Sequence, residues 1–224
     1  MIFDFDTISP EAKSKLLHST IVPRPIAWIT SLNAGGGRNM APFSFFNVFS
    51  TDPAILGFSV TASVFGGPKD TAANIRARKD FVVHLVSHEN RTAMNMTATE
   101  LPPEIDEIAL AGLTAVPSER VSAPRIAECD LAMECVLHSE VPLSDERSLF
   151  LGRVVMMHLA DGMVADAERH YVDAPALDLI GRMHGRGWYA RTTDLYRMDR
   201  PVTQDVLESI RSSSTPYEAP KREE

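Results

Sequence analysis

The sequence predicts a mainly β protein, an antiparallel barrel with a few helices at its periphery. Most of its apolar segments are short and contain many β-branched and aromatic residues, as β-strands do. Two longer predicted strands, at residues 128–138 and 149–159, are long enough to cross a barrel. The expected helices are few and do not alternate regularly with the strands, which disfavours a doubly wound parallel sheet.

The first half of the chain begins with a short helix and continues mainly as strands. Ser9 is suited to the N-cap of that helix and Pro10 to its first position. A glycine-rich turn at residues 33–38 predicts a hairpin between the strands on either side of it. The elements expected here are a helix at 10–17, strands at 25–32, 39–46 and 54–60, a helix at 70–78 and a strand at 81–86.

The second half contains two further helices before the long strands. Ser87 predicts the start of a helix that ends near residue 98. A helix at 104–111 follows, and Gly112 suits the left-handed position after it. The two long strands come next, joined by a polar link at residues 145–147.

Length and composition fit one large domain followed by a tail. The 224 residues are 44% hydrophobic and 23% charged, which is enough to form a packed core. We expect the barrel domain to cover residues 1–200 and a C-terminal helix and polar tail to cover 201–224. The formal net charge of −8 opposes binding to nucleic acid, whereas a mononucleotide needs only a few local donors.

No targeting segment or disulfide is expected. Residues 1–6 lack the basic region of a signal peptide, and no apolar run is long enough to span a membrane, so we expect a cytoplasmic protein. Cys129 and Cys135 lie six residues apart in one predicted strand, a separation of roughly 20 Å that exceeds the reach of a disulfide. We interpret them as two buried thiols on one face of that strand.

The common signatures of hydrolases and metal sites are absent from the sequence. Neither Gly-x-Ser-x-Gly nor Ser-x-x-Lys occurs, and the histidines and cysteines lack the spacing of metal ligands. His84 and His158 fall within strand patterns. We interpret both as hydrogen-bonded structural residues, and we predict no metal site.

The segment RNMAPFSFFN at residues 38–47 breaks the alternation of a half-buried strand. Pro42 cannot donate a hydrogen bond to a neighbouring strand, so an edge strand or a bulge is expected, and either leaves backbone groups free for a ligand. In a regular strand Asn39 and Ser44 would point to opposite faces, and only a bulge or backbone contacts would let both serve one ligand. The alternative is an aromatic-rich core strand that contains a badly placed proline.

The start of the helix at residue 70 is suited to an anion. Lys69 and Thr71 place an ammonium group and a hydroxyl where free N–H groups and the helix dipole favour a single phosphate. In the alternative interpretation Asp70 is an ordinary N-cap and Lys69 is solvated. A carboxylate beside a phosphate is repulsive, and the sequence does not settle the direction of Asp70.

Three blocks together resemble the flavin reductase family: RPIAWITS at 24–31, NMAPFSFF at 39–46 and KDT at 69–71. The resemblance covers roughly residues 15–200. It implies an antiparallel Greek-key split β-barrel of the FMN-binding type, usually a homodimer with the flavin near the subunit interface. It also implies hydride transfer from NADH or NADPH to the flavin, with the reduced flavin passed to a monooxygenase or another acceptor.

The resemblance further implies which residues contact the ligands. The block GRMHGRGWY at 181–189 also resembles the family's C-terminal segment, but His184 replaces an expected small residue there. His184 is the catalytic candidate, expected to contact nicotinamide or substrate; alternatively, it caps a loop. The expected FMN-binding residues are Asn39, Ala41, Pro42 and Ser44 at the ring and ribityl chain, Phe45 and Phe46 in the supporting wall, Ser59 and Val60 at a strand end near the ring, Lys69 and Thr71 at the phosphate, and Asp70 and Asn74 fixing the loop and helix.

Two other functions share most of these features. A non-catalytic FMN-binding electron-transfer protein, like a flavoredoxin, needs the same flavin site but no nicotinamide site. A split barrel that holds haem or another cofactor needs neither a flavin site nor a nicotinamide site. Flavin reduction by NADH or NADPH distinguishes a reductase from the electron-transfer protein. An absorbance spectrum identifies a protein that holds haem or another cofactor.

Overall fold

The computed structural model describes residues 1–185, 187–204, 206 and 207. The chain divides into a large compact unit, Met1–Thr193, and a second unit that begins at Asp194. The domain boundary expected at residue 200 stays a prediction. Residues 208–224 of the expected tail lie outside the described residues.

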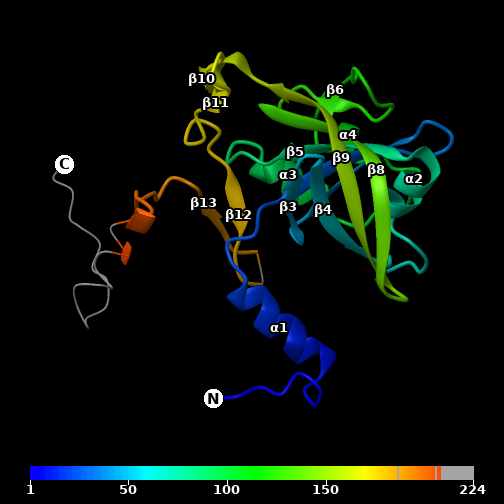
Figure 1. Cartoon of the computed structure of the whole chain (residues 1–224). Helices are drawn as coiled ribbons and strands as arrows, with labels where there is room; N and C mark the ends of the chain where they lie inside the picture. Colours follow the sequence, from blue (N-terminus) through cyan, green and yellow to red (C-terminus); the bar gives the residue numbers. More distant parts are fainter. Residues whose placement is uncertain (186, 205, 208–224) are drawn as a thin grey trace. The chain divides into compact units, whose positions relative to one another are not determined.

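Seven antiparallel strands form the main sheet of the large unit (Figure 1). Three hairpins of consecutive strands belong to this sheet, and helix α2 (Asp70–Arg78) lies on the long connection from β4 to β5. This arrangement confirms the predicted antiparallel Greek-key split barrel. The order across the sheet is β2 (Arg38–Phe43), β1 (Ala27–Leu32), β5 (Asp80–Leu85), β8 (Leu131–Ser144), β9 (Arg147–Leu159), β4 (Ala54–Thr61) and β3 (Phe46–Thr51).

The two edge strands, β2 and β3, are consecutive in the chain. Ser44 and Phe45 alone carry the chain from one edge of the sheet to the other, and we call these two residues the seam. Because two residues span only about 7 Å, the sheet must curl until its edges meet there. The Ser59 N–H donates to the Phe45 carbonyl at 2.9 Å and fixes the seam to β4.

The prediction of a single strand at 39–46 is therefore wrong, because the chain leaves β2 after Phe43 and enters β3 at Phe46. Strand propensity continues through both halves, but the curl of the sheet requires a bend between them. Pro42 lies opposite Trp28 in edge strand β2 with no shift in register. The edge position is thus confirmed and the bulge is not found.

Aromatic rings fill the inside of the barrel. Phe58 is fully buried, and its ring centroid lies 5.4 Å from that of Phe81 and 5.7 Å from that of Phe150. A Cβ on Gly152 would come within 2.3 Å of the Phe81 ring, so glycine on β9 makes room for this packing.

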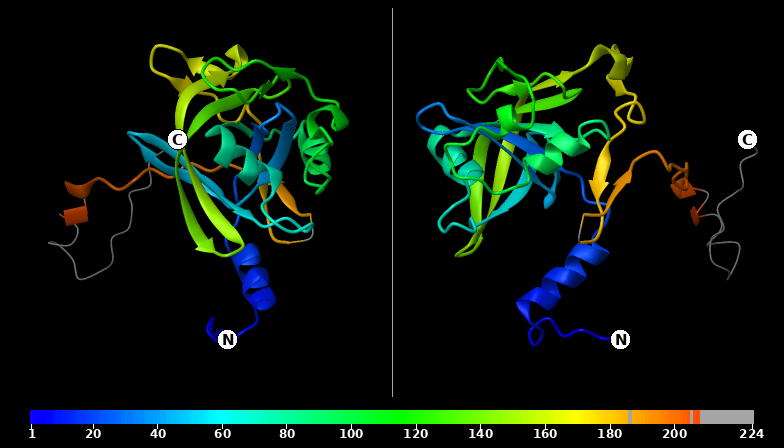
Figure 2. Two further views of the ribbon diagram at one scale, coloured as in Figure 1. Left: turned by 90° about the vertical axis from the view of Figure 1, so that its right-hand side faces the viewer. Right: turned by 180° about the vertical axis from the view of Figure 1, so that it is seen from behind.

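Helix α1 (Pro10–Thr20) begins as predicted and is longer than expected. The Ser9 hydroxyl accepts a hydrogen bond from the Ala12 N–H at 3.2 Å, with Pro10 at the first helical position. The helix extends away from the barrel in both views of Figure 2. Its end is joined to the barrel by Arg24, which donates to the carbonyls of His18 and Ile21.

Helices α3 (Arg91–Met96) and α4 (Glu107–Leu110) are shorter than predicted. Ser87 does not cap α3, because its hydroxyl accepts from the Asn90 N–H one residue before the helix begins. The Asp106 carboxylate caps α4 and so moves its start three residues later than expected. Gly112 adopts a φ of 69°, as predicted for the residue after this helix.

The long hairpin β8–β9 begins later than expected, so the interpretation of the cysteines is wrong. Pairing with β9 starts at Leu131, which leaves Cys129 before the strand. Cys135 is buried among the barrel residues, whereas Cys129 packs against a second apolar cluster that includes Trp28. Both are free thiols.

Several short elements were not predicted. Their two- or three-residue lengths give too little periodicity to recognise. The short elements are strands β6 (Ala115–Val116), β7 (Arg125–Ile126), β10 (Val164–Asp166), β11 (Tyr171–Val172), β12 (Ile180–Arg182) and β13 (Tyr189–Arg191), and the 3₁₀ helix η1 (Asp161–Met163).

None of the described helices is long and apolar enough to cross a membrane.

His84 and His158 are structural, as interpreted from the sequence. The His84 ring is fully buried between the Trp28 carbonyl and the Ile126 N–H, each 3.0 Å away. Because Nε2 accepts from Ile126, Nδ1 carries the proton and donates to Trp28. His158 Nε2 lies 2.6 Å from the carboxylate of the buried Glu134.

Candidate flavin site

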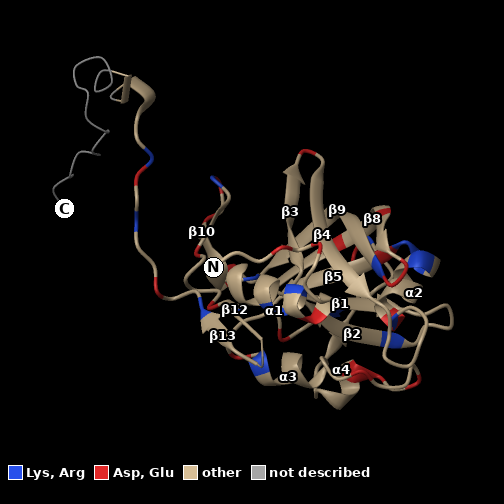
Figure 3. Cartoon of the chain, turned by 90° about the horizontal axis from the view of Figure 1, so that it is seen from below, with Lys and Arg blue, Asp and Glu red and all other residues tan. Residues whose placement is uncertain are grey.

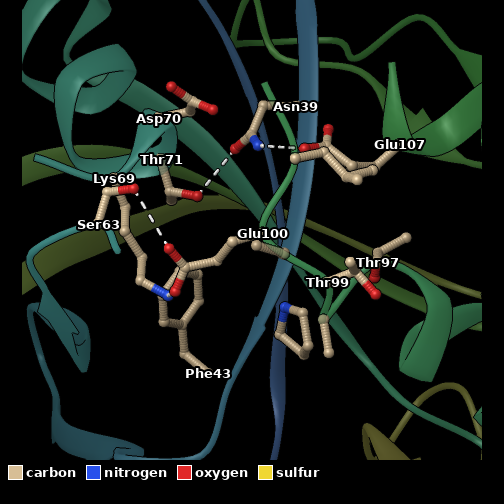
Figure 4. Close-up of a pocket in the computed structure, with 14 residues that line it drawn as sticks. Asn39, Phe43, Ser63, Lys69, Asp70, Thr71, Thr97, Thr99, Glu100 and Glu107 are labelled. Carbon is tan, nitrogen blue, oxygen red and sulfur yellow. Dashed lines mark hydrogen bonds and ion pairs between the residues drawn. The ribbon is translucent and has the colours of Figure 1, made fainter. Parts of the chain in front are cut away.

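A pocket lies where strand β2, the start of α2 and the segment after α3 meet (Figure 4). Its cavity volume is about 70 Å³. Edge strand β2 supplies a wall with free backbone groups, and α2 supplies its N-terminus. Six of the expected FMN-binding residues line this pocket: Asn39, Ala41, Pro42, Lys69, Asp70 and Thr71.

A buried polar network forms the floor of the pocket. The Asn39 side-chain oxygen accepts hydrogen bonds from the Thr71 hydroxyl at 2.8 Å and the Ser31 hydroxyl at 3.2 Å. The Asn39 amide donates to Glu107, and the Asn74 amide donates to Ser31. These side chains satisfy one another, so their contribution is to fix β2 against α2 and α4.

Glu107 carries a carboxylate into this network. Its side chain is 5% exposed and also accepts from the Met40 N–H at 3.2 Å. Burial raises the pKa of Glu107 above its ordinary value, although its hydrogen bonds act in the opposite direction. The carboxylate therefore attaches α4 to the backbone of β2.

Three donors converge beside the network to form an anion-binding group, which we call the cradle: the Lys69 ammonium, the Val64 N–H and the Ser63 hydroxyl. All three bind the carboxylate of Glu100, at 2.5, 2.8 and 3.2 Å respectively. Burial acts to raise the pKa of Glu100, but hydrogen bonds from the cradle outweigh it and hold this pKa below its ordinary value. Figure 4 shows Ser63, Lys69 and Glu100 gathered at one side of the pocket. The cradle therefore binds a carboxylate of the protein itself.

Asp70 is not the N-cap of α2. Lys69 occupies that position and makes no side-chain capping bond, while Asp70 is the first helical residue. The interpretation of Lys69 as solvated is also wrong, since it is paired with Glu100. Burial raises the pKa of Asp70, and the nearby carboxylates of Glu100 and Glu104 raise it further.

Three of the remaining candidates on β4 and the seam line two other pockets. Ser44 and Phe45 border a cavity of about 320 Å³, and Val60 borders another of about 380 Å³. The Ser59 hydroxyl accepts from Arg147 at 3.0 Å, and the Arg147 guanidinium lies 5.3 Å from the Phe45 ring centroid. Arg147 of β9 thus contacts both Ser59 of β4 and Phe45 of the seam.

Arg24 joins the seam to the end of α1 and to the segment after β12. Its guanidinium donates to three carbonyls, those of His18, Ile21 and Met183, each at 2.8 Å, and lies 3.4 Å from the Ser44 hydroxyl. The residue is only 4% exposed. Burial lowers the pKa of Arg24, and the charge of Arg182 lowers it further.

His184 lies apart from these pockets in the turn between β12 and β13. The side chain is exposed, and its ring centroid is 5.5 Å from that of Trp188. It borders none of the three pockets described above. Its role at nicotinamide or substrate stays a prediction.

Four polar residues of the site were missed from the sequence: Ser31, Ser63, Glu100 and Glu107. Asn39 and Glu107 are 68 positions apart, and Lys69 and Glu100 are 31 positions apart, so no local pattern links them. Acidic and basic residues are interspersed in the view of Figure 3 and do not mark the pocket. No group of His, Cys, Asp and Glu in the described part of the chain could hold a metal ion.

The main sheet is thus an antiparallel split barrel, and a group of anion-binding donors lies beside its edge strand β2. Residues 18–175 match the family model described as "Flavin reductase like domain". The chain belongs to this family.

The chain is also similar to known proteins in sequence and in structure. An uncharacterised protein of Deinococcus radiodurans is 39% identical over 202 residues, which is 88% of each chain. Nitrilotriacetate monooxygenase component B from Bacillus cereus superimposes with a TM-score of 0.82 at 33% identity, over 88% of this chain and 98% of that one. The 2-nitrobenzoate 2-nitroreductase NbaA of Pseudomonas fluorescens gives a TM-score of 0.82 at 31% identity, over 91% of this chain and 98% of that one.

Proposed function

We propose that this protein binds FMN and transfers a hydride from NADH or NADPH to it, so that the reduced flavin serves a further acceptor. The observation that carries the proposal is the cradle: three donors from one loop converge on a single anion beside an edge strand. This donor set fits a phosphate monoester, the group that distinguishes FMN from riboflavin.

The chain's own residues have distinct parts in this proposal. Lys69, Ser63 and the Val64 N–H would hold the phosphate, while Ala41 and Pro42 of β2 would lie beside the rest of the cofactor. Bound flavin supplies the hydride-accepting chemistry. The protein contributes proximity and orientation, which explains why no acid–base pair is needed in the pocket.

The structural relatives support a redox function and leave the acceptor open. One relative is a component of a monooxygenase system and another is a nitroreductase. We therefore propose a monooxygenase component as the acceptor of reduced flavin, and an aromatic nitro compound as the second acceptor to test. A cytoplasmic location is part of the same proposal.

Spectroscopy with a nicotinamide titration tests the function. Purified protein with FMN should consume NADH or NADPH faster than the non-enzymatic reaction and bleach the visible absorbance of the flavin. Bound flavin without such reduction would leave the electron-transfer alternative. Protein that neither purifies yellow nor quenches the fluorescence of added FMN would rule out flavin binding.

Lys69→Ala tests the phosphate contact separately. A hydrogen bond to a charged group contributes about 1.5–3 kcal/mol, so we expect FMN affinity to fall roughly 10- to 100-fold, with riboflavin affinity unchanged. Lys15→Ala removes a lysine from exposed α1 and serves as the control. Equal weakening of FMN and riboflavin would reassign Lys69 to a structural role.

A further inference from the structure

Glu100 occupies the position that a ligand phosphate would take. Its two carboxylate oxygens receive all three donors of the cradle, from Lys69, Val64 and Ser63. A phosphate bound by the same donors would place its oxygens where the carboxylate oxygens lie. A second anion cannot take the same position, because the Glu100 carboxylate fills the space and holds the single hydrogens of the Val64 N–H and the Ser63 hydroxyl.

The volume of the pocket leads to the same conclusion. Its cavity of about 70 Å³ is well below the roughly 300–1,000 Å³ of a typical ligand site. The segment Thr97–Leu101 lines one side of this cavity. The cavity beside the cradle can therefore admit the phosphate of a ligand only if this side moves outward.

The segment that carries Glu100 is held at both ends. Thr97 accepts a hydrogen bond from Trp28 Nε1 at 2.8 Å, and Asp106 accepts one from Arg38 at 2.7 Å. Between them, in the described chain, the Glu100 side chain makes the only hydrogen bonds that join residues 100–104 to the rest of the pocket. Releasing Glu100 would free the middle of the segment while leaving its ends in place.

We propose that Glu100 is an internal anion that fills the cradle in the ligand-free protein and is displaced by the phosphate of FMN. This inference rests on the proposed function and adds how the same site is controlled. Binding then becomes an exchange of one anion for another. A flavin without a phosphate cannot compete for the cradle and leaves Glu100 in position.

Glu100→Ala tests the exchange, with Glu104→Ala as its matched control. Glu104 lies on the same segment and is exposed, so its removal takes away the same charge without emptying the cradle. Affinities for FMN and riboflavin are measured by fluorescence quenching. Inorganic phosphate is the second probe, read out as the shift it causes in Tm.

We expect Glu100→Ala to bind FMN about tenfold more tightly than the wild type, with riboflavin affinity unchanged. Phosphate alone should raise the Tm of Glu100→Ala more than that of the wild type or of Glu104→Ala. Unchanged FMN affinity, or an equal gain for both flavins, would overturn the exchange while leaving FMN binding intact. If no variant binds FMN, the proposed function fails, and the phosphate measurement alone decides whether Glu100 is an internal anion.

Discussion

Replacing His84 with glutamine would remove a buried titratable group from the protein. Burial lowers the pKa of His84 to about 4 from an ordinary value of 6.5, with smaller contributions from the charges of Arg125 and His158. The hydrogen bond to the Trp28 carbonyl acts in the opposite direction. The folded protein thus holds this ring neutral at a pH where the unfolded chain protonates it.

Because the pKa of His84 is lower in the folded than in the unfolded state, acid lowers the stability of the protein. The unfolded state binds more protons below pH 6.5, so the stability associated with neutral His84 is present above 6.5 and is lost as the pH falls toward 4. From about pH 8 to about pH 5 the expected loss from this one group is about 2 kcal/mol. Carboxylates of the protein also titrate in this pH range, but they do so in both the wild type and the His84→Gln variant.

Denaturant unfolding at both pH values gives the measurement. His84→Gln should be less stable than the wild type at pH 8, because it loses two buried hydrogen bonds. Its free energy of unfolding should then fall by about 2 kcal/mol less than that of the wild type on acidification. His138→Gln, at an exposed position on β8, is the control. If the wild type and His84→Gln lose equal stability between the two pH values, His84 is not held neutral by burial.

Three further predictions concern the site, the edge strand and the thiols. Thr71→Val should lower the free energy of unfolding by about 1–2 kcal/mol, because Asn39 loses a buried donor; an unchanged Tm would contradict this. Phe49 on β3 is 62% exposed, and if this edge forms the expected homodimer, Phe49→Glu should reduce the mass measured by light scattering to that of a monomer. Burial raises the pKa of Cys129 to about 12 and that of Cys135 still higher, so neither thiol should react with a thiol reagent at pH 8 before the protein unfolds.

Features that depend on a few neighbouring residues could be predicted from the sequence. Ser9 and Pro10 mark the start of α1 because the capping bond reaches only to Ala12. Gly112 marks the end of α4 because its positive φ is costly for other residues. Pro42 indicates an edge strand because it has no N–H to give to a neighbour.

Features that depend on distant pairing could not be predicted. The division of residues 39–46 at the seam follows from the order of all seven strands, which no short window contains. The contacts of Glu100 and Glu107 join segments that are far apart in the chain. Glu100 also follows no helical or strand period, since it lies in the irregular segment after α3. The structure thus brings several of the predicted site residues together at one pocket, whereas their acidic partners could not be predicted from the sequence.

The arrangement of the strands also has a consequence for the order of folding. The β1–β2, β3–β4 and β8–β9 hairpins have local contacts and can form early, whereas the β1–β5 and β4–β9 pairs must wait for distant segments to meet. The cradle lies on the connection between β4 and α2, and Glu100 reaches it from a later segment. An intermediate that contains only the hairpins would therefore lack the site. In refolding experiments, recovery of FMN quenching should mark the completed barrel and lag behind the recovery of strand content.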